Sequence, residues 1–151
     1  MEDQYFETLM KALKNTEKSE DVPVSSLILD PQGNVASIGW NTRQANWEIS
    51  NHAEINALNN LTTKIKSLNL DQYTLLTTLE PCQMCYGAIK QTKIKQIKYL
   101  VTSDKYGIHN HFSINDISPK LQKNSTPEQE RQYQEILETF FKKLRHPENN
   151  N

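Results

Sequence analysis

The sequence contains few cysteines, few glycines and no long apolar run. Of its 151 residues, only two are cysteine and four are glycine. Two cysteines cannot build a disulfide-stapled scaffold, and four glycines exclude a collagen-like or glycine-rich chain. No apolar run approaches the roughly 18 residues that a membrane-spanning helix requires. These absences leave an ordinary globular protein without a membrane span.

Neither sign of charge is in excess. Seventeen Lys and Arg against eighteen Asp and Glu give a formal charge of −1, so general attraction to nucleic acid or anionic lipid is not expected. A polyanionic partner would need a local basic patch. The first residues, Met1–Gln4, are acidic where a secretory signal would be basic. We therefore expect a cytosolic protein.

Apolar periodicity predicts a mixture of helices and strands. Helical spacing is found over residues 5–13, 52–61 and 133–144, and a further helix is expected to begin at Pro81, since proline suits the first helical position. Ser50 or Asn51 is the expected cap of the second helix. Apolar or β-branched segments predict strands over residues 22–29, 35–40, 73–79 and 94–101. The stretch 103–126 has no regular period and is expected to be loop with short elements.

The order of these elements indicates an α/β fold. The first two strands flank Asp30-Pro31-Gln32-Gly33, which matches a type I turn, and the later strands alternate with helices. We expect a three-layer α/β/α sandwich with a central mixed sheet. At this length one core is expected, so residues 1–146 are predicted to form a single domain and 147–151 a disordered tail.

Four side chains with metal or acid–base chemistry lie at the starts of two predicted helices. His52 and Glu54 open one helix, and Cys82 and Cys85 open the other. Cysteines three residues apart on a helix face the same way, as two thiolates on one tetrahedral zinc ion must. With His52 they make three ligands, which leaves the fourth zinc position open, as in catalytic sites.

Two other interpretations of the cysteine pair are possible. His109 or His111 could complete a structural zinc site, although one residue separates these histidines where zinc fingers have three to five. A thioredoxin-like redox pair would leave His52 and Glu54 without roles. Together, His52-Ala53-Glu54 and Pro81-Cys82-Gln83-Met84-Cys85 form the H-x-E and P-C-x-x-C signature of zinc-dependent nucleobase deaminases.

This signature implies hydrolytic deamination. Zinc lowers the pKa of bound water from near 16 towards about 7, which makes hydroxide available to attack the amidine carbon of a nucleobase. Glu54 is then the expected proton carrier: it takes the water proton, passes it to the adjacent ring nitrogen and later protonates the departing amine.

The sequence resembles the bacterial tRNA adenosine deaminases of the cytidine deaminase-like superfamily. The resemblance rests on four segments in order, namely Asp21-Val22-Pro23-Val24, Gly39-Trp40-Asn41, His52-Ala53-Glu54 and residues 78–89, and it covers roughly residues 20 to 105. It implies a homodimeric enzyme with one zinc ion per subunit that converts the wobble adenosine of a tRNA anticodon to inosine. It also implies that Asn41 contacts the target nucleotide and that Val24 lines its pocket.

The chain departs from that family in two loops. Residues 104–111 replace a Gly-rich stretch, so substrate contacts there cannot be transferred, although Asp104, Lys105 and Tyr106 are candidates for RNA contact. Trp47 lies where the family is polar, and it could stack on a base or pack. Further candidates for phosphate contact are two basic clusters, Lys90, Lys93, Lys95 and Lys98, and then Lys142, Lys143 and Arg145.

Two other functions remain open from the sequence. The same zinc chemistry serves deaminases of free nucleobases, nucleosides or nucleotides of the guanine or cytosine type. A non-catalytic zinc-binding interaction module is the alternative from another class, and the presence of Glu54 argues against it, since a scaffold needs only the ligands.

Overall fold

The computed structural model describes residues 1–113 and 117–146. Its helices are α1 (Asp3–Leu13), η1 (Lys14–Lys18), α2 (Arg43–Asn46), α3 (Ala53–Ile65), α4 (Gln83–Gln91), η2 (Ile108–Asn110) and α5 (Pro127–Arg145). Its strands are β1 (Ser25–Leu29), β2 (Val35–Trp40), β3 (Thr74–Leu79), β4 (Gln96–Val101) and β5 (Lys120–Lys123). The predicted tail, residues 147–151, lies outside the described residues.

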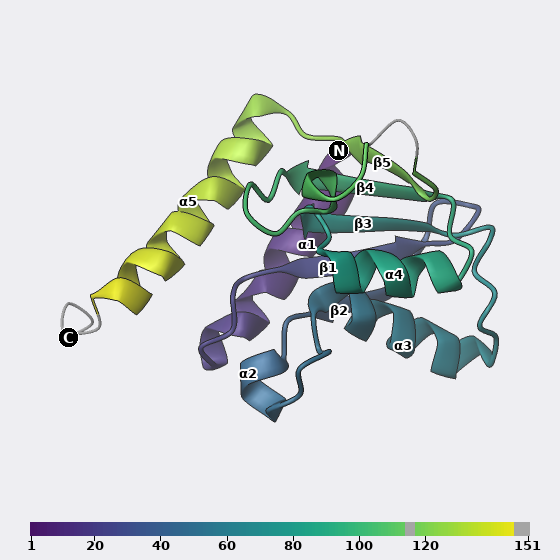
Figure 1. The fold of residues 1–151 in the computed structure, drawn as a ribbon, viewed down its shortest axis with the longest axis horizontal. Coiled ribbons are helices and arrows are strands. Elements are labelled where there is room, and N and C mark those ends of the chain that lie inside the picture. Colours follow the sequence, from purple (N-terminus) through teal and green to yellow (C-terminus); the bar gives the residue numbers. More distant parts are fainter. Residues whose placement is uncertain (114–116, 147–151) are drawn as a thin grey trace.

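The five strands form one mixed sheet in the order β2-β1-β3-β4-β5 (Figure 1). β1 pairs antiparallel with both β2 and β3, whereas β4 runs parallel to β3 and to β5. The predicted turn joins β1 to β2, with the Gly33 N–H donating to the Asp30 carbonyl at 3.0 Å. The mixed sheet that the element order predicted is therefore confirmed.

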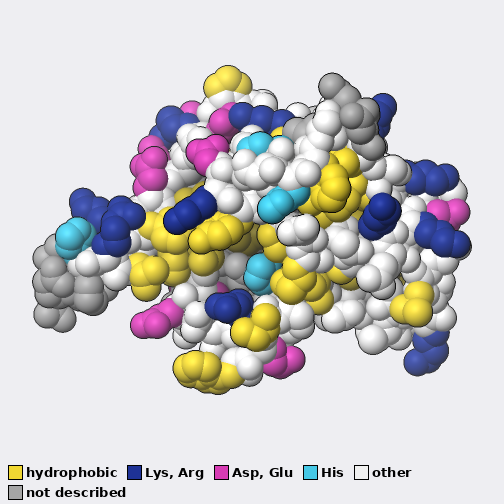
Figure 2. Space-filling view, viewed as in Figure 1, with side chains coloured by type: hydrophobic (Ala, Val, Ile, Leu, Met, Phe, Trp, Pro, Cys, Tyr) yellow, Lys and Arg dark blue, Asp and Glu magenta, His cyan; other side chains and the backbone are white. Residues whose placement is uncertain are grey.

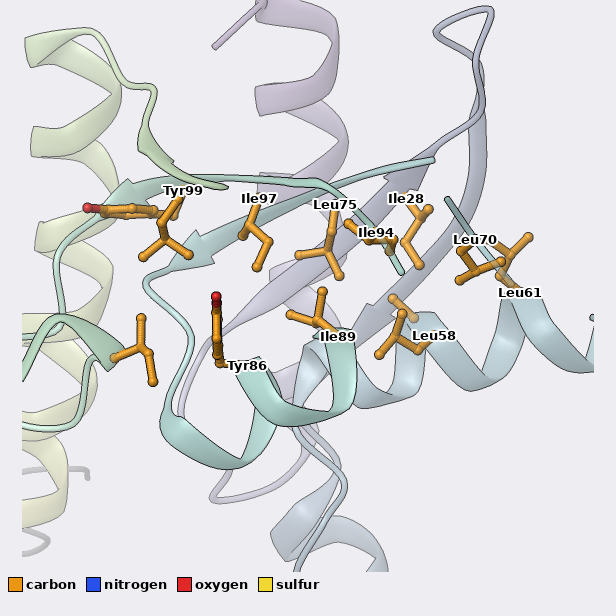
Figure 3. Close-up of a cluster of buried hydrophobic side chains, with 13 residues drawn as sticks. Ile28, Leu58, Leu61, Leu70, Leu75, Tyr86, Ile89, Ile94, Ile97 and Tyr99 are labelled. Carbon is orange, nitrogen blue, oxygen red and sulfur yellow. The ribbon is translucent and has the colours of Figure 1, made fainter. Parts of the chain in front are cut away.

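Helices cover both faces of this sheet, as a three-layer sandwich requires. On one face, α3 and α4 bury a cluster in which Leu58 and Ile89 meet Ile28, Leu75 and Ile97 of the strands (Figure 3). On the other face, α1 packs Leu9 against Leu27 and Leu76, and Phe6 joins Tyr133 of α5. The C-terminal part of α5 extends away from the sheet (Figure 1).

Gly39 sets how closely α3 approaches the sheet. A Cβ atom at Gly39 would lie 2.4 Å from the Ala57 nitrogen and 2.5 Å from the Ala53 carbonyl oxygen, both backbone atoms of α3. Only glycine leaves room for that approach. The start of α3, and with it His52, is thereby fixed against the end of β2.

Two expected helix starts are wrong. α3 has His52 as its N-cap residue, not Ser50 or Asn51, because the Asn41 side chain already accepts the first helical N–H, that of Ala53. α4 begins at Gln83 with Cys82 as N-cap. Pro81 stays outside that helix, because its carbonyl accepts the Ile108 N–H at 3.0 Å.

Apolar periodicity missed or shortened several elements. α2 is a single turn between β2 and α3, where no helix was predicted, and β5 lies within 103–126. β5 is an edge strand with one buried residue, Leu121, so its pattern carries almost no apolar signal. α5 begins at Pro127, earlier than its apolar stripe, because Thr126 and Gln129 form a capping box. Among residues 1–113 and 117–146, no helix is long and apolar enough to cross a membrane.

Candidate metal centre and deaminase site

Three side chains predicted as zinc ligands come together at the N-termini of two helices. His52 is the N-cap of α3, Cys82 is the N-cap of α4, and Cys85 lies in the first turn of α4. The His52 Nδ1 atom lies 3.7 Å from the Cys82 Sγ atom and 3.4 Å from the Cys85 Sγ atom. All three ligand atoms lie within 4.8 Å of one another.

These separations fit a tetrahedral zinc ion. Zn–N bonds of about 2.0–2.1 Å and Zn–S bonds of about 2.3 Å place the nitrogen and a sulfur about 3.6 Å apart at the tetrahedral angle. The two N···S distances lie on either side of that value. One imidazole and two thiolates are also the ligand types that zinc prefers. His52, Cys82 and Cys85 are therefore positioned to bind zinc through one nitrogen and two sulfurs.

The pKa values of the two cysteine thiols are shifted in opposite directions. A hydrogen bond from the Cys85 thiol, outweighing the effect of burial, lowers the pKa of Cys82 to about 4, and His52 contributes a further hydrogen bond. The same bond and burial raise the pKa of Cys85. A bound zinc ion would keep both sulfurs deprotonated, because a coordinating thiol loses its proton outright.

Glu54 is buried beside the ligands. It lies in the first turn of α3 and is 4% exposed. Burial raises its pKa above the usual range, and a hydrogen bond with the Cys85 side chain opposes that effect. A buried carboxyl group touching a zinc ligand is close enough to exchange protons with a reactant held at the metal.

Both the nitrogen and the oxygen of the Asn41 side-chain amide form hydrogen bonds within the protein. Its Nδ2 donates to the Val22 carbonyl at 2.8 Å, and its Oδ1 accepts the Ala53 N–H at 2.8 Å. One amide N–H and one lone pair of the side chain remain for another partner. The predicted nucleotide contact of Asn41 stays a prediction. Val24 is buried, 6% exposed, and its carbonyl accepts the Asn41 N–H.

Two buried carboxylates had no predicted role. Asp21 is 2% exposed and accepts the N–H groups of Gln44 and Ala45, which holds the first turn of α2. Glu80 precedes Pro81 and its side chain is completely buried against His109, with 2.7 Å between the Nδ1 and Oε1 atoms. For Glu80 the sequence offered one signal: it is an acidic residue at the end of an apolar strand, where a buried carboxylate needs hydrogen-bond partners.

The loop residues considered as extra ligands take other positions. His109 contacts Glu80 through Nδ1, and His111 is exposed. His109 therefore does not complete a four-ligand structural site. Figure 2 shows histidine side chains gathered near the middle of one face, with hydrophobic side chains around them. Trp47 is 88% exposed, so it does not pack in the core.

Comparison with known families agrees with the geometry of this site. The profile of the cytidine and deoxycytidylate deaminase zinc-binding region matches residues 1–101. The chain belongs to that family. The ligand set of His52, Cys82 and Cys85 therefore lies within a zinc-binding deaminase domain.

Among individual relatives, the tRNA-specific adenosine deaminase of Buchnera aphidicola subsp. Baizongia pistaciae is 34% identical over 149 residues, which is 95% of this chain and 90% of that protein. The tRNA(Ile)-lysidine synthase of Deinococcus deserti is 36% identical over 89 residues, 59% of this chain. The tRNA-specific adenosine deaminase of Haemophilus influenzae is 35% identical over 69% of this chain. The chain spans only 17% of the length of the Deinococcus protein and 62% of the length of the Haemophilus protein.

Solved structures share the fold. A structure described in a study of A-to-I editing by tRNA:A34 deaminases aligns with a TM-score of 0.75 at 22% identity, covering 89% of this chain and 99% of that one. A guanine deaminase from Nitrosomonas europaea aligns with a TM-score of 0.67 at 17% identity, covering 87% of this chain and 81% of that one. At these identities the likeness concerns the fold, and the two neighbours act on different bases.

Proposed function

We propose that this protein deaminates adenosine to inosine by hydrolysis at the wobble position of a tRNA anticodon. The observation that carries the proposal is the match over 95% of the chain to a tRNA-specific adenosine deaminase. It is supported by the three possible ligands that meet at one point, because three protein ligands would leave the fourth position of a tetrahedral zinc ion to a reactant. Because the guanine deaminase shares the fold, the fold itself does not select the base.

In this proposal His52, Cys82 and Cys85 hold the metal and Glu54 moves the protons. Zinc, when bound, supplies the nucleophile by lowering the pKa of water towards about 7. The Glu54 carboxylate would accept one proton of the water and deliver it to the ring nitrogen next to the reacting carbon. It would then accept the remaining proton of the added hydroxyl and pass it to the exocyclic amine, so that the C–N bond breaks and ammonia leaves. Burial raises the pKa of Glu54 above its usual range, which is the direction that suits a carboxyl group that must both accept and release a proton.

Asn41 and Val24 are the proposed contacts to the nucleotide. The free N–H and lone pair of the Asn41 amide are available to a ribose or base edge, while its other two bonds hold the start of α3. Val24 adds an apolar wall next to Asn41. An anticodon loop presents unpaired bases, so no duplex needs to be melted.

The remaining expectations complete the proposal. Residues 1–146 act as a single deaminase domain, two chains form a homodimer, and the protein works in the cytosol on the anticodon stem-loop. The exposed basic residues of α5, Lys142, Lys143 and Arg145, are the proposed phosphate contacts of that stem-loop.

The decisive experiment incubates the zinc-loaded protein with an unmodified arginine tRNA that carries adenosine at the wobble position. The matched substrate control is the same tRNA with guanosine there, and the enzyme control is Glu54→Gln. Inosine should form only with the first tRNA and the unaltered protein. Ammonia release from free guanine or cytidine compounds, without inosine in tRNA, would establish the free-base alternative instead. Zinc binding without any deamination would indicate a non-catalytic module.

A further inference from the structure

The buried carboxylate of Glu80 ties together two segments that are distant in sequence. Its Oε2 accepts the His109 backbone N–H at 2.8 Å, and its Oε1 accepts the Ser103 N–H at 3.2 Å. The His109 Nδ1 atom lies 2.7 and 2.8 Å from the two carboxylate oxygens. Because an ionised carboxylate only accepts hydrogen bonds, Nδ1 carries the proton and Nε2 is left without a part in this contact.

The loop from Ser103 to His109 is packed directly on the turn that carries the first zinc-ligating cysteine. Gly107 pairs with Cys82 in an isolated antiparallel bridge, and Ile108 donates to the Pro81 carbonyl at 3.0 Å. A Cβ atom at Gly107 would lie 2.4 Å from the Glu80 carboxylate. The loop therefore reaches the metal-binding turn only with glycine at this position and with the carboxylate in place.

The tip of this loop presents a cation and an aromatic ring to solvent. Tyr106 is 66% exposed, and the Lys105 Nζ atom lies 5.8 Å from the centroid of its ring. Aromatic rings stack on unpaired RNA bases and lysines contact phosphates. A further hydrogen bond, which the Asn110 Nδ2 donates to the Asp104 carbonyl at 2.9 Å, joins the two sides of this tip.

We propose that Glu80 and His109 act as positioning residues that hold loop 103–109 at the rim of the metal centre, where the loop binds the nucleotide next to the reacting adenosine. This inference rests on the proposed function and adds which nucleotide of the substrate the loop binds. Tyr106 stacks on the flanking base and Lys105 contacts its phosphate. His109 acts through Nδ1 and Glu80, without touching RNA through Nε2.

Substitutions at His109 separate these two modes of action. Asparagine places an amide N–H where Nδ1 stood, whereas glutamine places its amide near Nε2. His109→Asn should therefore preserve the bond to Glu80, and His109→Ala and His109→Gln should lose it. His111→Ala is the matched control, because His111 lies two residues beyond the loop and is exposed.

The kinetic measurement compares KM and kcat for inosine formation in tRNA. Since base–aromatic stacking contributes about tenfold or more to binding, Glu80→Gln, His109→Ala and His109→Gln should raise KM by about tenfold while kcat changes little. His109→Asn should restore KM to near that of the unaltered protein, and His111→Ala should leave it unchanged. Zinc content should be the same in all these variants.

A second measurement does not depend on activity. Hydrogen exchange at the amides of Ser103 and His109 should be slow in the unaltered protein and clearly faster in Glu80→Gln, because both amides donate to that carboxylate. Gly107→Ala should accelerate the same exchange while both partners remain present.

Three results would overturn the inference. Unchanged exchange in Glu80→Gln would show that the carboxylate does not hold the loop. Full activity of His109→Gln with impaired His109→Asn would place the action at Nε2. A fall in kcat and zinc content at constant KM would show that Glu80 supports the metal turn. If the unaltered protein makes no inosine, the proposed function fails, and exchange at the two amides still decides whether the pair holds the loop.

Discussion

The Asn41 side chain accepts the backbone N–H of Ala53 at 2.8 Å, so that the end of β2 provides the hydrogen bond that α3 lacks at its first residue. The same side chain donates to the Val22 carbonyl. The position of His52, one residue before Ala53, therefore depends on an amide eleven residues earlier in the chain. Asn41, which the family resemblance predicts to contact the substrate, therefore also has a structural role.

Replacing Asn41 should lower stability as well as activity. Asn41→Ala leaves the buried Ala53 N–H without its partner and removes one of the two donors to the Val22 carbonyl, which still accepts the Val24 N–H. We expect the free energy of unfolding to fall by about 1–3 kcal/mol. Asn41→Asp keeps the acceptor and should lose less. Urea unfolding of the zinc-loaded protein measures both. Equal stability of all three proteins would show that these bonds do not hold the helix start.

Gly39 should not tolerate a methyl group. Gly39→Ala brings a Cβ within 2.4 Å of the Ala57 nitrogen, so α3 must move, and overpacking of this kind costs about 1–3 kcal/mol. Zinc content should fall too, since His52 moves with α3. Gly87→Ala is the matched control: its Cβ has no neighbour within 4 Å, and alanine favours a helix. Identical melting temperatures for Gly39→Ala and the unaltered protein would contradict the close approach.

Glu54→Gln should separate catalysis from folding. The glutamine is nearly isosteric but cannot carry a proton, so inosine formation should fall by about 100-fold or more. Zinc content and the melting temperature should be retained or rise, since a buried ionisable group is lost. Zinc analysis and a thermal scan accompany the activity assay. Activity within a few fold of the unaltered protein would exclude Glu54 as the proton carrier.

The candidate zinc ligands could be predicted because their chemistry is local. Cysteines at i and i+3 must share a face of a helix, and a histidine two residues before a glutamate completes a known pattern. The structure brings Cys82, Cys85 and His52 together as that pattern predicts. Strands β2 and β3 were similarly evident, because their apolar residues are bounded by turn signals.

The contacts that fix the site were not predictable in this way. The bonds from Glu80 to His109 and from Asn41 to Ala53 join residues 29 and 12 positions apart, and nothing in the local pattern specifies such partners. β5 was not predicted for another reason. Only Leu121 is buried in this edge strand, so its sequence lacks the alternation of apolar and polar residues that distinguishes a strand from a loop. The position of Pro81 before the α4 cap also depends on a distant segment, through Ile108.

Loss of either cysteine should remove the metal. Cys82→Ser and Cys85→Ser each replace a thiolate by a poorer ligand, so zinc content should fall sharply after dialysis against a chelator. Zinc should also leave as the pH falls, since protons compete for the thiolates and the imidazole. Elemental analysis of the dialysed proteins checks this. Full zinc occupancy in either variant would contradict the ligand assignment.

X-ray absorption at the zinc edge of the purified protein tests the central claim most directly. We predict one zinc ion per chain with two sulfur neighbours at about 2.3 Å and light-atom neighbours at about 2.0–2.1 Å, one of them an imidazole nitrogen. His52→Ala should remove the imidazole scattering and leave both sulfurs. A spectrum with four sulfur neighbours, or protein that binds no zinc when the ion is supplied, would contradict the account.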